Sequence, residues 1–218
     1  MAINRDEQIE KLIDDISSIK TVIMQNKPII RQLLLPLPFR RFLLITGLII
    51  IVYSILIYFL IVQFSNYAAI PEIYKNIFYG LLILTWLALI IMKYSTWLRT
   101  LKKIDSKYTL KRALKEFLTQ KVIHVLLPLS FIVIFLIIYL VHFDAYRFIV
   151  PAASIGSGLI YNFLGSMTDI KQYLIAGYWF LITGILIITF SVIPIPIALA
   201  ISIGCGHILL AAISHKEE

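Results

Sequence analysis

The chain alternates long apolar runs with short polar stretches. The six apolar runs cover residues 42–64, 73–92, 122–143, 148–167, 173–193 and 195–213. A helix of about 20 apolar residues crosses a hydrocarbon core about 30 Å thick. We therefore expect an all-α integral membrane protein with six transmembrane helices, between a segment at 1–41 and a tail at 214–218.

Prolines lie close to three of the four connections that join these runs directly. Pro71 precedes the second run, Pro151 opens the fourth, and Pro194 and Pro196 flank the start of the sixth. Proline is tolerated in the first turn of a helix because the amide there has no helical partner. The six spans are therefore predicted to pair as three helical hairpins.

The polar stretch at 93–121 predicts how the protein is oriented. It holds nine Lys or Arg against two acidic residues, Asp105 and Glu116. Only Lys75 and Arg147 fall in the turns at the other face, so the remaining 18 of the 20 Lys and Arg share one side. Short basic loops stay cytoplasmic during insertion. We expect both termini in the cytoplasm and the chain in the cytoplasmic (inner) membrane.

Composition supports a lipid environment. The chain is 60% hydrophobic and 15% charged, with a mean hydropathy of +0.91, whereas soluble domains carry about 25% charged residues. Its net charge of +8 lies beside apolar runs, which favours anionic lipid headgroups as partners over nucleic acid. Cys205 is the single cysteine, so neither a disulfide framework nor a thiolate metal cluster is expected.

The segment at 1–41 predicts a cytoplasmic amphipathic helix followed by an interfacial stretch. Ile9, Ile16, Ile23 and Ile30 recur every seven residues, a heptad pattern, and Pro28 should end or kink the helix. Acidic residues outweigh basic ones in its first half. We expect docking against the basic stretch or self-association, with a loosely ordered arm as the alternative.

The basic stretch predicts helical structure with one apolar face and one basic face, broken near 106–109. Such faces bind anionic headgroups or protein partners. The residues predicted to make these contacts are Arg99, Lys102, Lys103, Lys111, Arg112 and Lys115. A second copy of the chain or another membrane protein is the expected protein partner.

Small residues crowd the fourth and sixth spans. Gly156 and Gly158 lie in the fourth, and Ser202 and Gly206 lie in the sixth at a four-residue spacing. Hydrophobic burial does not drive helices together in lipid, so close approach through small residues becomes a main source of association. These four residues are the predicted packing seam, and their helices should be the inner ones, with the first and third spans nearer lipid.

The same two spans carry polar residues at depth. Asn162, Ser166 and Asp169 share one helical face, and His207 lies in the sixth span. An ionisable residue inside a membrane is a candidate for function. These four form the candidate intramembrane polar site, unless His207 only hydrogen-bonds to Asn162 or a hydroxyl and fixes the register of the bundle.

No catalytic, cofactor or metal site is expected from the motifs. Cys205 and His207 are two residues apart, so on a helix they point in nearly opposite directions. The chain has no His-Glu-x-x-His and no phosphate-binding loop. Asp144 and Asp169 are predicted at opposite membrane faces, which excludes an aspartyl dyad.

Three functions follow from these patterns. The first is a non-catalytic scaffold, regulatory or accessory component that acts through its cytoplasmic helices. The alternative is a small channel or transporter with a path along helices four to six. A lipid-modifying membrane enzyme comes third.

Overall fold

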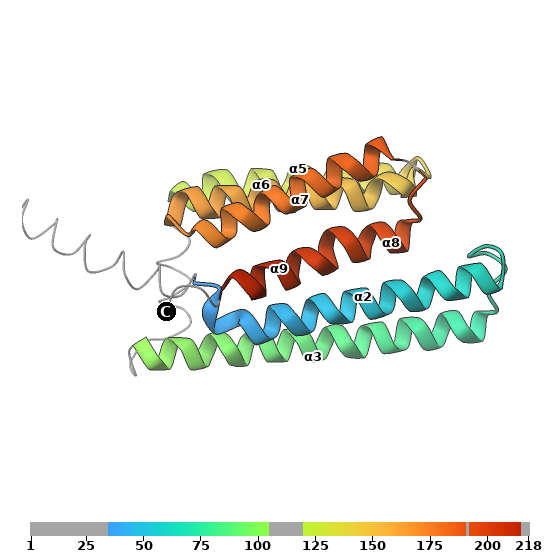
Figure 1. The fold of residues 1–218 in the computed structure, drawn as a ribbon, viewed down its shortest axis with the longest axis horizontal. Helices are drawn as coiled ribbons and strands as arrows, with labels where there is room; N and C mark the ends of the chain where they lie inside the picture. Colours follow the sequence, from blue (N-terminus) through green and yellow to red (C-terminus); the bar gives the residue numbers. More distant parts are fainter. Residues whose placement is uncertain (1–34, 105–119, 191, 215–218) are drawn as a thin grey trace, which may run out of the picture.

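The computed structural model describes residues 35–104, 120–190 and 192–214, and within these ranges the chain is all-helical (Figure 1). The elements are η1 (Leu37–Phe39), α2 (Arg40–Gln63), α3 (Glu72–Ile104), α5 (Gln120–His142), η2 (Tyr146–Phe148), α6 (Ile149–Thr168), α7 (Lys171–Thr189), α8 (Ile195–Leu199), η3 (Ala200–Gly204) and α9 (Cys205–Ile213). Six helical stretches are long and apolar enough to cross a membrane. The prediction of an all-helical chain with six helices of membrane-spanning length is confirmed.

Helix bounds depart from the apolar runs at two places. α3 runs on to Ile104, past the predicted span end at 92, because the residues that follow keep an apolar stripe on a continuous helix. α7 stops at Thr189 with Phe190 as its C-cap, before the predicted 193. The predicted amphipathic helix before Pro28, the first part of the interfacial stretch that follows it, the break at 106–109 and residues 215–218 lie outside the described residues.

The sixth span is not the continuous α-helix that its sequence predicts. Between α8 and α9 the five residues of η3 form a π-helical turn. The Trp179 indole N–H lies 3.3 Å from the carbonyl oxygen of Ile201 and 3.2 Å from that of Ser202, and donates to both. A π turn changes the helical hydrogen-bond pattern and is frequent at functional sites. The indole of the neighbouring α7 thus satisfies carbonyls within the irregular turn.

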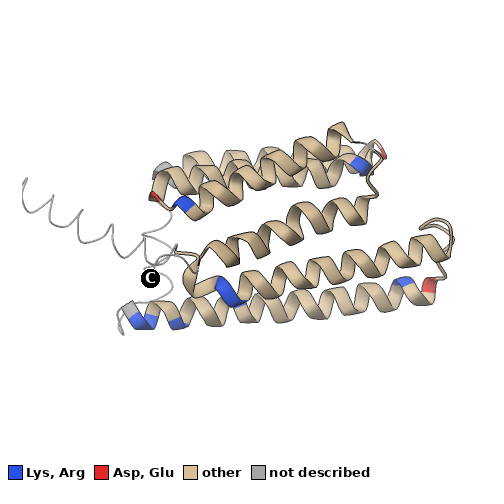
Figure 2. Cartoon of the chain, viewed as in Figure 1, with Lys and Arg blue, Asp and Glu red and all other residues tan. Residues whose placement is uncertain are grey.

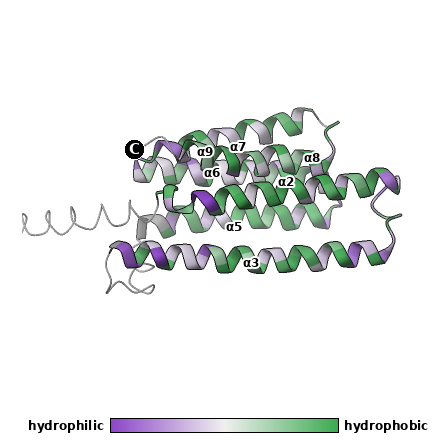
Figure 3. Cartoon of the chain, turned by 60° about the horizontal axis from the view of Figure 1, so that its bottom comes forward, coloured by the Kyte–Doolittle hydropathy of each residue, from purple (hydrophilic) through white to green (hydrophobic). Residues whose placement is uncertain are grey.

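The inner helices are α6, α7 and the α8–α9 span. Their most extensive contact is between α6 and α7, while α2 packs along η3 and α9. The most apolar windows of α3 and α5 contain no buried residue, and α3 lies at the edge of the bundle (Figure 3). The fourth and sixth spans are inner, as expected from their small residues, and the fifth joins them. The third span is outer as expected, but the first, α2, packs along the sixth, and the second, α3, is the other outer helix.

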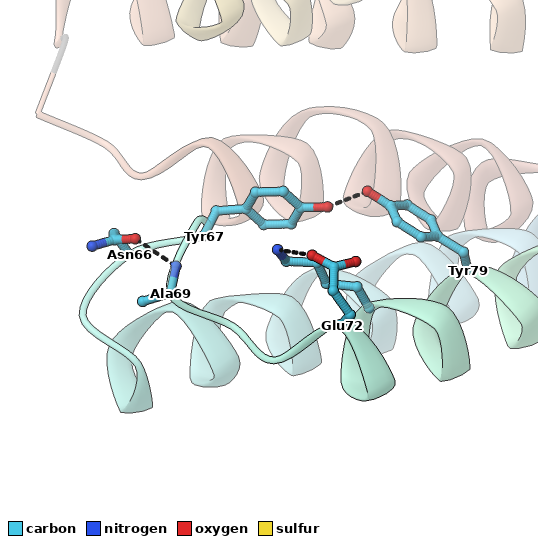
Figure 4. A network of polar contacts seen from close by, with 6 residues as sticks. Asn66, Tyr67, Ala69, Glu72 and Tyr79 are labelled. Atoms are coloured by element: carbon cyan, nitrogen blue, oxygen red, sulfur yellow. Dashed lines mark hydrogen bonds and ion pairs between the residues drawn. The ribbon is translucent and has the colours of Figure 1, made fainter.

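Polar contacts fix the turn between α2 and α3 (Figure 4). The Ala69 N–H donates to the Asn66 side-chain oxygen at 2.8 Å. Glu72 and Lys75 form an ion pair at 2.8 Å in the first turn of α3, where an acidic residue also favours the helix N-terminus. The hydroxyls of Tyr67 and Tyr79 are hydrogen-bonded to each other.

Basic residues gather at one end of the described bundle, where α2 begins and α3 ends (Figure 2). There the Arg40 Nε donates to the Ala211 carbonyl oxygen at 3.3 Å. Cations beside the last turn of a helix interact favourably with its free carbonyls and its dipole. Arg40 therefore ties the start of α2 to the end of α9, and we call this end of the molecule the basic end.

Candidate functional site

The four residues of the predicted polar site occupy different environments. His207 is partly buried on α9 and Asn162 partly buried on α6, whereas Ser166 and Asp169 are exposed. The Asn162 amide packs against the backbone of Gly177 on α7, and its Oδ1 atom is buried with no hydrogen-bond partner. The structure thus does not gather these residues into one polar cluster.

Asp169 ends α6 in a left-handed backbone conformation. Its φ is 55°, and its N–H donates to the carbonyl oxygen of Gly165. The Ile170 N–H donates to the same oxygen at 3.2 Å. Aspartate tolerates this conformation better than most non-glycine residues. Asp169 therefore serves as a helix cap at the turn into α7.

His207 is held by its own helix and by α7. Its Nδ1 lies 2.8 Å from the carbonyl oxygen of Ile203, and a carbonyl can only accept, so Nδ1 carries the proton. The Phe180 ring lies edge-on to the imidazole, with 5.9 Å between centroids. With Nδ1 protonated, Nε2 of the neutral ring is a hydrogen-bond acceptor.

The predicted packing seam lies at helix contacts. A Cβ atom on Gly156 would meet Val133 of α5, one on Gly158 would meet the Gly177 carbonyl oxygen of α7, and one on Gly206 would meet Phe180. The fourth residue, Ser202, donates to the Ser154 hydroxyl at 2.5 Å. All four predicted residues are buried.

A buried hydroxyl network that the sequence did not indicate continues from Ser202. Ser154 donates to the Phe180 carbonyl oxygen at 2.7 Å, and the Thr183 hydroxyl lies 3.5 Å from that of Ser154. Ser154 and Ser202 are fully buried. The network links α6, α7 and η3 and satisfies its own polar groups, so its role is in packing.

A large cavity, lined in part by His207, lies between α3 and the rest of the bundle. Its volume is about 1100 Å³, and it begins near Pro36 at the basic end and reaches Tyr53 in the middle of α2. α3 lines it with a stripe at helical spacing: Leu82, Thr85, Trp86, Leu89, Ile90, Lys93, Tyr94 and Trp97. The opposite wall includes Ser157 and Tyr161 of α6 and Ile203 and His207 of the sixth span.

α3 reaches the other helices on both sides of this cavity. Toward the middle of the bundle, the Tyr53 and Thr85 hydroxyls are 2.8 Å apart, and Tyr53 meets Phe78 edge-on. At the basic end α3 contacts η1, and Leu101 is 1% exposed. Contacts of α3 therefore bound the cavity at both ends, and the cavity is half-open between them.

Lys93 is the one charged residue among the described residues that line the cavity. It is exposed. Sequence reasoning placed Lys93 only at the start of the basic stretch. The four-residue spacing of Thr85, Leu89, Lys93 and Trp97 indicates that these residues share one face of the helix. The sequence does not show which helices lie opposite that face, so it could not predict the cavity.

The predicted headgroup contacts follow Lys93 along α3. Arg99, Lys102 and Lys103 are exposed at the basic end. The remaining members of this prediction, Lys111, Arg112 and Lys115, lie outside the described residues. The described part of the chain holds no group of three or more His, Cys, Asp or Glu that could bind a metal ion.

Comparisons of the chain with known protein families, with curated proteins and with solved structures yield no match. The function is therefore argued from the chemistry of the cavity and of the residues around it.

Proposed function

We propose that this protein is a non-catalytic accessory component of a membrane that binds a lipid between α3 and the other helices. The observation that carries the proposal is the cavity of about 1100 Å³ at the basic end, lined mostly by apolar side chains. Cavities that hold small amphiphiles have apolar walls with a few polar groups that fix orientation. The aliphatic and aromatic walls here match a hydrocarbon chain.

The length of the cavity supports a lipid as the occupant. Its α3 wall extends from Trp97 to Leu82, and the part between Lys93 and Leu82 is about 16 Å long at 1.5 Å per residue. This is about half the thickness of a hydrocarbon core of about 30 Å. A lipid that entered from the leaflet at the basic end would place its chain beside Leu89 and its headgroup near Lys93.

The other two functions have less support. The α6–α7 contact is close, with the Gly158 Cα beside the Gly177 backbone, which leaves little room for a path between these helices. A path along helices four to six therefore stays a prediction. A lipid-modifying enzyme would need a nucleophile or an acid–base pair beside the bound lipid. His207 is the one imidazole among the described lining residues, and its Nδ1 is hydrogen-bonded to the Ile203 carbonyl of its own span, so this hypothesis also stays a prediction.

The accessory role also rests on the basic end. Arg99, Lys102 and Lys103 extend from α3 just beyond the cavity, where headgroups or a partner could bind them. We infer that this end faces the cytoplasm, because short basic segments are retained there.

The orientation is tested by labelling in intact cells. In a chain with Cys205→Ala, a cysteine at Lys102 should resist an impermeant thiol reagent until the membrane is opened. A cysteine at Glu72, at the opposite end, should react directly, because that side chain is 78% exposed. Labelling of Lys102→Cys from outside intact cells would reverse the orientation.

Lipid binding is tested by native mass spectrometry of the protein extracted in mild detergent. Leu89→Trp fills the cavity, while Leu87→Trp makes the same change on the same helix at a position outside the lining that is 52% exposed. We expect wild type and Leu87→Trp to retain one lipid and Leu89→Trp to lose most of it. Equal retention in both variants, or no retained lipid in wild type, would contradict the proposal.

A further inference from the structure

We propose that the bound lipid is an anionic phosphodiester with a hydroxylated headgroup, the chemistry of phosphatidylglycerol, and that Lys93 and His207 recognise that headgroup. This inference rests on the proposed lipid binding and names the class of lipid. It follows from the charge of one wall of the cavity and the hydrogen-bond chemistry of the other.

Lys93 is a cation with no counterion among the residues that the structure describes. The ion pair found among the described residues joins Lys75 to Glu72 at the far end of α3, and the described cavity wall contains no Asp or Glu. Its side chain is exposed beside the cavity, so it can pair with an anion that binds there, and charge-assisted contacts are the stronger class of hydrogen bond. A phosphodiester carries one negative charge and would supply the missing partner.

Aromatic residues support a headgroup at this level. Tyr94 and Trp97 line the same end of the cavity as Lys93. Tyrosine and tryptophan favour the membrane–water interface, where one part of the ring is in lipid and its polar atom meets the headgroups. The α3 wall therefore changes from hydrocarbon-like at Leu89 to interfacial at Trp97 within a few turns.

His207 adds a group with the opposite hydrogen-bonding character. Because the Nδ1–H donates to the Ile203 carbonyl oxygen, Nε2 of the neutral imidazole is left as a hydrogen-bond acceptor. A phosphate oxygen cannot donate to this nitrogen, but a headgroup hydroxyl can. The Phe180 ring packs edge-on against the imidazole.

A cation and an acceptor on one cavity distinguish between lipid classes. A phosphatidylcholine headgroup brings a quaternary ammonium toward Lys93 and has no hydroxyl for His207. Phosphatidylmethanol has the negative phosphodiester but no hydroxyl. Phosphatidylglycerol satisfies both residues, so these three lipids separate the contribution of Lys93 from that of His207.

The test is competition between these lipids, with identical acyl chains, for the purified full-length protein in native mass spectrometry. A charge-assisted contact predicts that wild type prefers phosphatidylglycerol over phosphatidylcholine about tenfold. We expect Lys93→Met to retain one lipid and to bind the two classes about equally. Lys171→Met, the same change at an exposed position at the start of α7 and outside the cavity lining, should keep the wild-type ratio.

The hydroxyl contact is read from phosphatidylglycerol against phosphatidylmethanol. Wild type and His207→Gln, which keeps an acceptor, should prefer phosphatidylglycerol by several-fold, and His207→Phe should abolish that preference. The preference of the wild-type protein between these two lipids tests the hydroxyl contact even if His207→Phe fails to fold. Equal binding of the two lipids by wild type would contradict that contact.

The outcomes separate the two proposals. A wild-type protein that holds one lipid but binds phosphatidylglycerol and phosphatidylcholine equally overturns the headgroup assignment and leaves lipid binding intact. A preference that survives Lys93→Met also overturns the assignment. Absence of a retained lipid in wild type overturns the proposed function itself.

Discussion

Two faces of the bundle differ in how neighbouring helices meet. On the closed face, α6, α7 and α9 approach through Gly158, Gly177 and Gly206, and added Cβ atoms there would collide with neighbouring atoms. On the open face, α3 presents Trp86, Leu89 and Trp97 across a cavity of about 1100 Å³. Helices that are all rich in apolar residues thus form a packed interface on one face of the bundle and a cavity on the other.

The difference shows what decides between packing and binding inside a membrane. Helices in lipid gain stability from close van der Waals contact and interhelical hydrogen bonds, not from hydrophobic burial. Small residues permit that contact on the closed face, where Ser154 and Ser202 add hydrogen bonds. Large side chains and a lysine on α3 keep the helices apart on the open face, where the cavity lies.

The largest expected effect comes from adding one methyl group to the closed face. In Gly158→Ala the new Cβ would lie 2.8 Å from the Gly177 carbonyl oxygen and 2.9 Å from the Leu181 nitrogen. Both are backbone atoms, so the helices must separate, at a cost of about 2–3 kcal/mol. We expect a clear drop in the thermal unfolding temperature in detergent.

Gly80→Ala is the matched change on the open side. No atom lies within 4 Å of the position of its added Cβ, and alanine is favoured over glycine in a helix by about 0.5–1 kcal/mol. Its unfolding temperature should stay the same or rise. Equal losses in the two variants would mean that the closed face is not specially packed.

A smaller effect is expected from the buried hydroxyls. Ser154→Ala removes the bond to the Phe180 carbonyl and the acceptor for Ser202, and hydrogen bonds between membrane helices contribute about 0.6–1.7 kcal/mol. Ser166→Ala, at an exposed position on the same helix, serves as the control. A destabilisation of Ser154→Ala no larger than that of Ser166→Ala would show that the network contributes nothing to the closed face.

A substitution at Asp169 should stabilise the protein, unlike the changes above. Asp169 has a left-handed backbone conformation with φ of 55°. Asp169→Gly should stabilise the protein by up to about 1 kcal/mol, since glycine adopts this conformation without steric cost. Asp169→Val should destabilise it. If Asp169→Gly is more stable and still binds lipid, the role of Asp169 is to form the turn. If Asp169→Gly loses lipid binding, Asp169 belongs to the candidate intramembrane polar site.

Much of the molecule could be predicted from sequence because the signals are local. Apolar length predicted the six helices, and the small residues predicted which helices lie inside. The cavity could not be predicted, since it depends on which wall Leu89 and Lys93 face across the bundle. The π turn was equally hidden, because its carbonyls are satisfied by Trp179 from another helix.

The smallest effect concerns the turn between α2 and α3, outside the membrane core. The hydrogen bond that the Tyr67 hydroxyl donates to Tyr79, together with partial burial, raises the pKa of Tyr67 from 10.0 to about 12. The phenol therefore stays protonated in the folded turn where an unfolded chain would ionise. Its contribution to stability is present below pH 10 and is lost as the pH rises through about 12.

Tyr79→Phe should make Tyr67 ionise at a lower pH, as measured by ultraviolet difference titration against a Tyr67→Phe variant. Tyr178→Phe, on a residue that is 60% exposed on α7, should leave the titration of Tyr67 unchanged. An unaltered titration after Tyr79→Phe would show that the contact between the two hydroxyls is absent in solution.

The most direct test of lipid binding is a cryo-electron microscopy map of the protein in a lipid nanodisc, with a bound antibody fragment to add mass. We predict elongated density between Leu89 of α3 and Ile203 of the sixth span, with a headgroup feature between Lys93 and His207. A map in which α3 closes onto α6 and α9, and the space between them holds no density, would contradict the proposal.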